Sequence, residues 1–371
     1  MRDAFIIAGL RTPVCPRNGA LSEFGVVDLG AAVLRALLAR VACSVGDVDQ
    51  VIIGNALYGG GNPARNILLA AGLPESQPAL TIDTQCCAGL DAILLAANLV
   101  RCGEADLVAA GGAESFSRAP LRFHRPLDPG EAPKEYRRPP FAPWPGRDPD
   151  LLAAAAAFAE HRRLSRQAQE AFACESHRKA LAAEHVPELV PIGTAVGDAF
   201  ARPLSTGVCR RSPVLAGAGD HAITTALVAV EADAAGFVLV ASERAATMLA
   251  PARACRIVAG ARLGCPPETP MLGAQAAANA LPCNASSVAV AEIMEAFACQ
   301  AMGAVKDLSL PDSVVNRGGG ALARGHPIGA SGAILAVRLL HEMAREVEGA
   351  RGIAAIAAAG GLGSALLLER V

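Results

Sequence analysis

The chain has 371 residues, of which 52% are hydrophobic and 18% charged, a balance that supports a large buried core and argues against disorder. Its formal net charge of −2 gives no electrostatic reason to expect nucleic acid or an anionic membrane as a partner. The eleven cysteines show no zinc-ligand spacing, so we expect reduced thiols in a cytoplasmic protein and no metal site. The opening residues lack a signal-peptide pattern, and we find no apolar run of membrane-spanning length without charges or helix breakers.

The first part of the chain alternates strand-like and helix-like segments. Strands are predicted at residues 4–8, 50–54, 79–82 and 107–110, the last ending in Gly111-Gly112. Helices are predicted from a cap at Asp28 to about residue 41, and at about residues 64–73 and 88–100. This alternation predicts a largely parallel sheet covered by helices.

The next part of the chain interrupts this alternation. Eight prolines fall within residues 121–150, which excludes a regular helix or a central strand there. A helix with alternating charges is predicted at about residues 165–183. We therefore predict an inserted loop subdomain at residues 119–225, within an N-terminal half that covers 1–118 and resumes at about 226–251.

The second half, residues 252–371, repeats features of the first. After a strand-like stretch at 228–242, a strand is predicted at 288–292, helices at 294–305 and 332–343, and a strand at 353–359 that ends in Gly360-Gly361. Both halves contain a glycine-rich turn, an apolar helix and a strand that closes on two glycines. This similarity indicates an α/β fold with a duplicated, five-layered α-β-α-β-α core.

One cysteine lies where a turn leads directly into a predicted helix. Cys86 stands in the segment Asp83-Thr84-Gln85-Cys86-Cys87, just before an apolar helix. Unpaired N–H groups and the positive dipole end of a helix lower the pKa of a thiol and can hold an oxyanion. The alternative interpretation of Cys86 is a buried cysteine that serves only packing.

Two glycine-rich turns lie near the C-terminus. In residues 316–332, His326 stands between Gly325 and Pro327, where a rigidly held imidazole could activate a thiol, although a lone histidine can equally be structural. Gly360 and Gly361 open the second turn, a Gly-Gly-x-Gly segment that is a weak signal without a surrounding nucleotide-binding unit.

Several segments then carry a resemblance to one family. They are IIAGLRTPVCPRNGAL at residues 6–21, GNPAR at 61–65, DTQCCAGLDAI at 83–93, GGAESFSRAP at 111–120, EIMEAFACQ at 292–300 and the glycine-rich run at 316–332. Their order and spacing resemble the thiolase superfamily over nearly the whole chain. In that family the corresponding motifs read NPAR, CxSG, GGxESMSxAP, EINEAFAxQ and GHPxGASG.

The resemblance implies a thiolase fold and a mechanism. Cys86 would attack an acyl-CoA thioester while His326 accepts its proton, leaving an acyl-enzyme and free coenzyme A. The N–H of Cys86 and one from the turn formed by Ala359, Gly360 and Gly361 would hold the thioester oxygen. Coenzyme A and acyl-CoA would be substrates, with no permanently bound cofactor, and residues that bind coenzyme A are not identified.

The sequence departs from the family at positions that carry the second half of the reaction. The family's CxG cysteine, which removes a proton from the second acyl-CoA, is Ala357, and the asparagine of NEAF is Met294. Ala88 replaces the serine of CxSG, and residues 224–235 are more apolar than the family's pantetheine-facing segment. Cys87 and Cys299 are the remaining thiols that could replace the missing base. We expect condensation and thiolysis to be impaired.

The sequence leaves two functions open. The first is an acyltransferase that uses Cys86 and His326 with a different acceptor. The second is a non-catalytic subunit that binds acyl-CoA or supports a partner enzyme. By resemblance we expect a homodimer or homotetramer, with a heteromeric partner as the alternative, and neither nucleic acid nor membrane as a partner.

Overall fold

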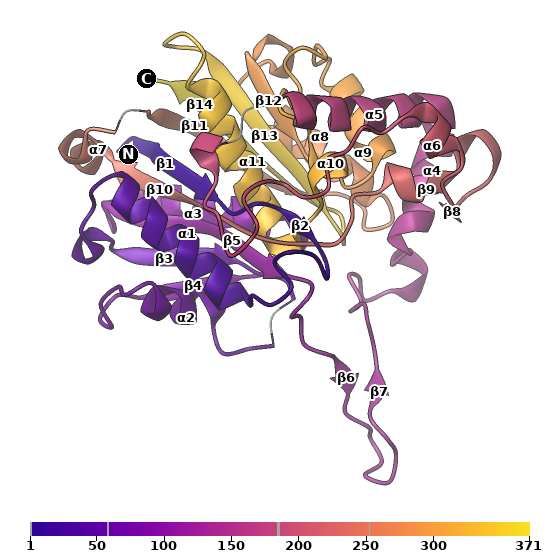
Figure 1. The fold of residues 1–371 in the computed structure, drawn as a ribbon, viewed down its shortest axis with the longest axis horizontal. Coiled ribbons are helices and arrows are strands. Elements are labelled where there is room, and N and C mark those ends of the chain that lie inside the picture. The colour runs from indigo at the N-terminus through magenta and orange to yellow at the C-terminus, as the bar shows by residue number, and fades with distance from the viewer. Residues whose placement is uncertain (1, 58, 184–185, 252) are drawn as a thin grey trace.

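A computed structural model of the chain describes residues 2–57, 59–183, 186–251 and 253–371. Its main sheet follows the strand order β12-β13-β14-β11-β1-β10-β5-β3-β4, with β2 (Cys15–Pro16) paired to β10 (Figure 1). The strands of the N-terminal half are β1 (Ala4–Arg11), β3 (Gln50–Gly54), β4 (Ala79–Ile82), β5 (Leu107–Ser115) and β10 (Ala232–Ser242). Those of the C-terminal half are β11 (Cys255–Gly264), β12 (Val290–Ile293), β13 (Arg351–Ala358) and β14 (Leu362–Arg370).

The pairing of the strands shows the internal repeat. In the first half β3 pairs in parallel with β4 and β5, and β5, β10 and β1 follow in antiparallel order. In the second half β12 pairs in parallel with β13, and on its other side Ala291 of β12 forms a single parallel bridge with Val315. Strands β13, β14 and β11 follow in antiparallel order. The two halves meet where β1 pairs with β11 at Phe5 and Ile6.

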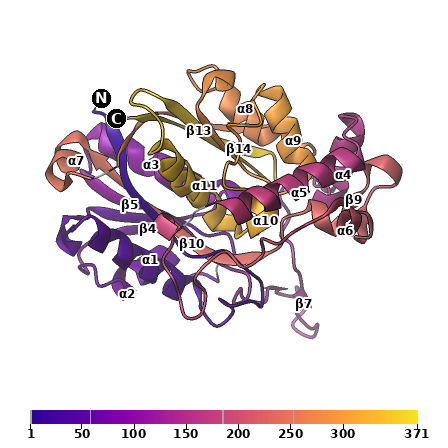
Figure 2. The same ribbon diagram turned by 45° about the horizontal axis from the view of Figure 1, so that its top comes forward.

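The corresponding helices of the two halves pack against each other in the middle of the molecule. Helix α3 (Ala88–Cys102) and helix α11 (Ile328–Met343) contact each other and both halves of the sheet (Figures 1 and 2). Helices α1 (Val26–Arg40) and α2 (Pro63–Ala70) pack on the outer face of the N-terminal half, and α8 (Gly273–Asn279) packs on the C-terminal half. The layers therefore follow the order helix, sheet, helix, sheet, helix, as predicted.

Burial on all sides explains the composition of the central helix. Among the described residues, one helical stretch, Gln85–Cys102, is long and apolar enough to cross a membrane by length and composition alone, and 61% of it is buried. A helix that is covered by sheets and a neighbouring helix is apolar all round for the same reason as a membrane span. The position of this stretch between the two halves accounts for its hydropathy.

Two of the predicted boundaries that differ from the structure have a clear physical reason. Helix α1 is capped by Gly25, and the Asp28 carboxylate accepts a hydrogen bond from the Gly25 N–H at 2.9 Å from within the first turn. Strand β5 does not end at Gly111 and Gly112 but runs through both. A Cβ atom at Gly112 would stand 2.1 Å from the carbonyl oxygen of Gly329, so this glycine lets α11 approach the strand closely.

The insertion between β5 and β10 contains the elements that cover the C-terminal half. They are β6 (Phe123–His124), β7 (Lys134–Glu135), α4 (Leu151–His161), α5 (Arg166–Ala182), α6 (Thr206–Arg210), β8 (Val214–Ala216) and β9 (Ile223–Thr224). The proline-rich segment forms no α-helix or central strand, as predicted, and β6 and β7 form a hairpin that projects from the body (Figure 1). Helices α4 and α5 pack on α9 (Ala298–Asp307), which begins four residues later than predicted.

The remaining elements are short. Helix α7 (Glu243–Leu249) follows β10, and α10 (Ala321–Arg324) lies in the glycine-rich run before His326. Short 3-10 helices occupy Val45–Asp47, Gln85–Cys87, Pro145–Arg147, Val186–Glu188, Gly219–His221, Thr225–Leu227, Pro270–Leu272 and Ala285–Ser287.

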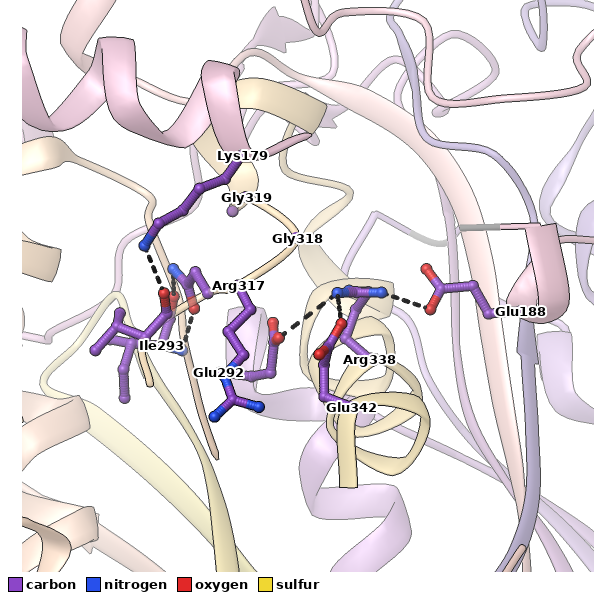
Figure 3. A network of polar contacts seen from close by, with 12 residues as sticks. Lys179, Glu188, Glu292, Ile293, Arg317, Gly318, Gly319, Arg338 and Glu342 are labelled. Carbon is purple, nitrogen blue, oxygen red and sulfur yellow. Dashed lines mark hydrogen bonds and ion pairs between the residues drawn. The ribbon is translucent and has the colours of Figure 1, made fainter. Parts of the chain in front are cut away.

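A buried ionic network ties the insertion to the central helix. Arg338 of α11 lies between three carboxylates, with Nη1 2.8 Å from Glu188 and Nη2 2.7 Å from Glu342 and 3.9 Å from Glu292 (Figure 3). All four side chains are nearly inaccessible to solvent. Since a buried charge is costly without partners, this arrangement fixes α11 against the inserted segment that carries Glu188.

Candidate active site

Cys86 occupies a strained turn at the start of the central helix. Gln85, the preceding residue, has φ of 55°, a left-handed conformation that is uncommon for a side chain other than glycine. The Asp83 carboxylate holds this turn by accepting a hydrogen bond from the Gln85 N–H at 2.8 Å. The chain then passes through the 3-10 turn Gln85–Cys87 into α3, which places the thiol at the helix N-terminus.

His326 is held opposite this thiol by its own backbone. Gly325, with φ of 116°, takes a conformation open mainly to glycine, and the His326 N–H donates to the Val230 carbonyl oxygen at 2.8 Å. The His326 Nε2 atom lies 3.2 Å from the Cys86 Sγ atom. The two predicted residues, 240 positions apart in the chain, are therefore within hydrogen-bonding distance.

The other ring nitrogen of His326 sets the tautomer. His326 Nδ1 lies 2.6 Å from the Ser331 hydroxyl oxygen, and that hydroxyl donates its proton to the Pro327 carbonyl oxygen at 2.9 Å. A neutral ring with its hydrogen on Nδ1 satisfies both contacts, with the Ser331 oxygen as its acceptor. Nε2 then has a free lone pair directed to the thiol, as a general base requires.

Burial keeps both groups neutral in the resting site. It raises the pKa of the Cys86 thiol to about 12, although backbone N–H groups of Ala359 and Cys86 act in the opposite direction. Burial also lowers the pKa of His326 to about 4. Backbone N–H groups therefore act on the thiol pKa in the predicted direction, but desolvation of the sulfur outweighs them and the net shift is upward.

The backbone N–H groups that act on the Cys86 sulfur, those of Ala359 and of Cys86 itself, belong to the segments predicted to supply them. An N–H of Ala359, next to Gly360, acts on the Cys86 sulfur, whereas Gly360 and Gly361 are absent from the described lining of the cavity around it. These glycines have φ of 77° and 78° and form the turn from β13 to β14. They shape the turn that presents Ala359, and their assignment as oxyanion donors stays a prediction.

Cys86 and His326 open into a small, mostly apolar cavity of about 190 Å³. The lining residues come from well-separated segments of the chain, and they are Cys86, Phe116, Leu151, Val228, Ala229, Glu231, Pro270, Met271, Ala296, Phe297, Gln300, His326, Ile328, Ala357, Ala358 and Ala359. Ligand pockets for drug-sized molecules measure roughly 300–1,000 Å³. A larger hollow of about 840 Å³, between α5 and α9, is lined by neither Cys86 nor His326.

The two departures from the family pattern lie in different surroundings. Ala357 stands in the cavity wall, so the position of the missing base does face the space beside Cys86. Met294 is 2% exposed, belongs to the apolar core and is absent from the described lining. Neither substitute thiol lines the cavity: the Cys87 sulfur lies 3.7 Å from the Ile356 carbonyl oxygen and the Cys299 sulfur 3.5 Å from that of Ala155.

Glu114 is a residue of the site that sequence reasoning quoted but did not assign. Its buried carboxylate accepts hydrogen bonds from the Asn55 amide at 2.6 Å and from the N–H groups of Ala56 and Gly329 at 2.9 Å. Burial raises the pKa of Glu114 to about 7. Through Gly329 this side chain fixes the start of α11, and with it the loop that carries His326.

Glu295 organises the glycine-rich run in a similar way. Its carboxylate accepts hydrogen bonds from Asn316 at 2.6 Å, from Ser176 at 2.7 Å and from the Leu322 N–H at 3.2 Å. A Cβ atom at Gly320 would come within 2.0 Å of this carboxylate, which explains why glycine stands there. The glycine-rich run therefore surrounds a protein carboxylate at this point.

The structure places no metal cluster at the site. Across the described ranges, no group of three or more His, Cys, Asp or Glu side chains is arranged to hold a metal ion. The chemistry available from these residues is proton transfer between Cys86 and His326, with backbone N–H groups close to the sulfur.

Comparisons with known proteins agree with this geometry. The family model of the thiolase N-terminal domain matches residues 4–201, and that of the thiolase C-terminal domain matches residues 247–370. An acetyl-CoA acetyltransferase of Pseudomonas aeruginosa is 34% identical over 393 residues, and a 3-oxoadipyl-CoA/3-oxo-5,6-dehydrosuberyl-CoA thiolase of Escherichia coli is 35% identical over 403 residues; each match covers 100% of both chains.

A solved structure has the same architecture. A thiolase of Ascaris suum, determined in complex with coenzyme A, superposes with a TM-score of 0.90 at 28% sequence identity and covers 100% of both chains. Such agreement over the whole chain confirms the predicted fold.

Proposed function

The chain belongs to the thiolase family, and from this premise we propose that it is an acyl-CoA acyltransferase that forms an acyl-thioester on Cys86. The observation that carries the proposal is the 3.2 Å contact between the Cys86 thiol and His326 Nε2. The hydrogen bond from Nδ1 to Ser331 supports it, since that bond leaves Nε2 as the proton acceptor.

The proposed acylation step needs no group other than these residues to transfer the proton. The Cys86 sulfur attacks the carbonyl carbon of an acyl-CoA while its proton passes to His326 Nε2. The tetrahedral oxyanion would be stabilised by backbone N–H groups, and the candidates are those of Cys86 and Ala359, which act on the sulfur. As the intermediate collapses, the bond to the coenzyme A sulfur breaks and His326 returns the proton to that leaving thiolate. The products are acyl-Cys86 and coenzyme A.

The second half of an ordinary thiolase reaction lacks its base. Ala357 faces the cavity without a titratable group, and neither Cys87 nor Cys299 lines it. Loss of a general acid or base costs about 10²–10⁴ in rate. We therefore propose that Claisen condensation and thiolysis are slow, and that transfer of the acyl group to a thiol or to water is the chemistry left to the pair.

A binding role is the second candidate, and one observation favours it. Burial holds the pKa of Cys86 at about 12 and that of His326 at about 4, so the resting pair is an uncharged thiol and imidazole. Such a pair reacts only if proton transfer accompanies the attack. If it does not, the chain would hold acyl-CoA without turnover, as a subunit of a larger assembly.

Intact mass spectrometry separates these candidates. The purified protein is incubated with acetyl-CoA and a few longer acyl-CoAs, and Cys86→Ala is treated in parallel. An acyl adduct that is absent from the variant is the expected result. If no donor gives an adduct while acetyl-CoA still binds, the acyltransferase proposal is wrong and the binding role replaces it.

A further inference from the structure

One polar side chain of the cavity has no partner. Gln300 lies in the first turn of α9 and is 2% exposed, yet neither its Nε2 nor its Oε1 atom has a hydrogen-bond partner among the described residues. It lines the same cavity as Cys86 and His326. A carboxamide that is buried without partners is destabilising, so an unsatisfied one in a native protein calls for a ligand or a water.

The N-terminus of α9 reaches the same cavity. Its cap, Phe297, lines the cavity and makes no side-chain capping hydrogen bond, and Ala296 precedes it in the wall. The first N–H groups of a helix lack partners inside the helix and carry the positive end of its dipole. An oxygen atom placed beside Gln300 would therefore find both a donor and a favourable field.

The other polar groups of the cavity are already occupied. Cys86 and His326 contact each other, and Glu231 pairs with Arg17 at 2.9 Å in an exposed position at the rim. Most of the remaining wall consists of alanine, valine, leucine, isoleucine, proline, methionine and phenylalanine side chains. Gln300 is the lining side chain that offers a free donor and a free acceptor in the part of the chain that the structure describes.

Whether the Gln300 carboxamide finds hydrogen-bond partners depends on the acyl group in the cavity. A plain alkyl chain in a cavity of about 190 Å³ would displace water from Gln300 and give nothing in return. An acyl chain that carries a hydroxyl or keto oxygen supplies an acceptor for Nε2, and a hydroxyl also supplies a donor for Oε1. A site built to bind such an oxygen discriminates against the analogue that lacks it.

We propose that Gln300 binds an oxygen substituent on the acyl chain, so that the cavity selects short hydroxyacyl or ketoacyl groups over alkyl ones. This proposal rests on the proposed function, because it names the acyl class that Cys86 receives. It assigns specificity to a side chain that takes no part in proton transfer.

Matched donors test the assignment. Single-turnover acylation of Cys86 is followed by intact mass with 3-hydroxybutyryl-CoA, acetoacetyl-CoA and butyryl-CoA, which separates a hydroxyl from a keto oxygen. The parent protein is expected to react about 10-fold faster with at least one oxygenated donor than with butyryl-CoA, the effect of one or two neutral hydrogen bonds. In Gln300→Met, a substitution of similar length, the ratio is expected to fall to about one.

The control is a buried glutamine that lies away from the cavity. Gln275 of α8 is 5% exposed, also has an unpartnered Oε1, and does not line the cavity, so Gln275→Met should keep the donor ratio of the parent. Thermal melting of Gln300→Met should not fall below that of the parent, since two unsatisfied polar atoms are removed. A large loss of melting temperature would assign Gln300 a structural role and overturn the proposal.

Equal rates for the three donors in the parent, or an oxygen preference that survives in Gln300→Met, would also overturn it. If no donor acylates Cys86, the proposed function is wrong, but the preference assigned to Gln300 can still be tested by binding. Affinities of the same three acyl-CoAs are then compared by calorimetry in Cys86→Ala, with and without Gln300→Met. The expected ratio is again about 10-fold with Gln300 present and about one without it.

Discussion

Restoring a thiol at position 357 should restore condensation chemistry. Ala357 is partly exposed to the cavity that contains Cys86 and His326, and it pairs across β13 and β14 with Gly363, which has no side chain to obstruct a larger residue. The single sulfur atom added by Ala357→Cys can therefore occupy the cavity without displacing the core. It would supply the general acid and base that the parent lacks.

The size of the gain follows from the missing group. One general acid or base contributes about 10²–10⁴ in rate, which corresponds to about 3–5 kcal/mol of activation free energy. Thiolysis of acetoacetyl-CoA, measured by loss of its enolate absorbance, should rise by that factor in Ala357→Cys. Full thiolase turnover is not expected, because Met294 still leaves the second thioester oxygen without its family partner.

Ala357→Ser is the matched control, since it adds a group of nearly the same size that is a poor base at neutral pH. It should remain close to the parent. If Ala357→Ser and Ala357→Cys were equally active, the gain would come from shape and not from proton transfer. If the parent already cleaved acetoacetyl-CoA as fast as Ala357→Cys, the reasoning from the missing base would be refuted.

Three further predictions follow from the site and the surface. Ser331→Ala should slow acylation about 10-fold, because the Nδ1 anchor of His326 is lost, while Ser331→Thr should retain it; equal rates would contradict the tautomer argument. Acylation should be independent of pH between about 6 and 9 and fall only toward pH 4, where His326 gains a proton, and a thiolate absorbance of Cys86 at neutral pH would contradict this. Light scattering should give a dimer or tetramer, since the projecting segment exposes Leu121 and Leu127, and a monomer at micromolar concentration would contradict it.

Local periodicity predicted the elements of the sheet and the central helices closely. The strands at 50–54 and 79–82 have the predicted bounds, and α3 extends two residues past its predicted end. Boundaries failed where a tertiary contact overrides a local signal. Gly111 and Gly112 mark the end of a strand in the sequence, but here they lie within β5, because Gly112 lets α11 approach the strand.

In the candidate site, too, the residues could be identified from the sequence, whereas the properties that depend on tertiary packing could not. Cys86 and His326 were identifiable from their motifs, and the structure brings them together. The upward shift of the Cys86 pKa could not be predicted from the sequence. Desolvation depends on which residues pack around the sulfur, and a motif shows only the neighbours in the chain. Gln300 was present in a quoted motif, but its lack of partners is a property of the folded cavity alone.

The departures from the family pattern divide the reaction at one point. The residues proposed for acylation form an unbroken chain of contacts, from Ser331 through His326 to Cys86, and Glu114 fixes the start of the helix beside them. In the proposed mechanism, the missing base at Ala357 affects only the step that follows acylation. A site that had lost all function would have no physical reason to hold Cys86 and His326 at hydrogen-bonding distance. The geometry therefore favours a protein that loads an acyl group and transfers it by a step that needs no carbon acid.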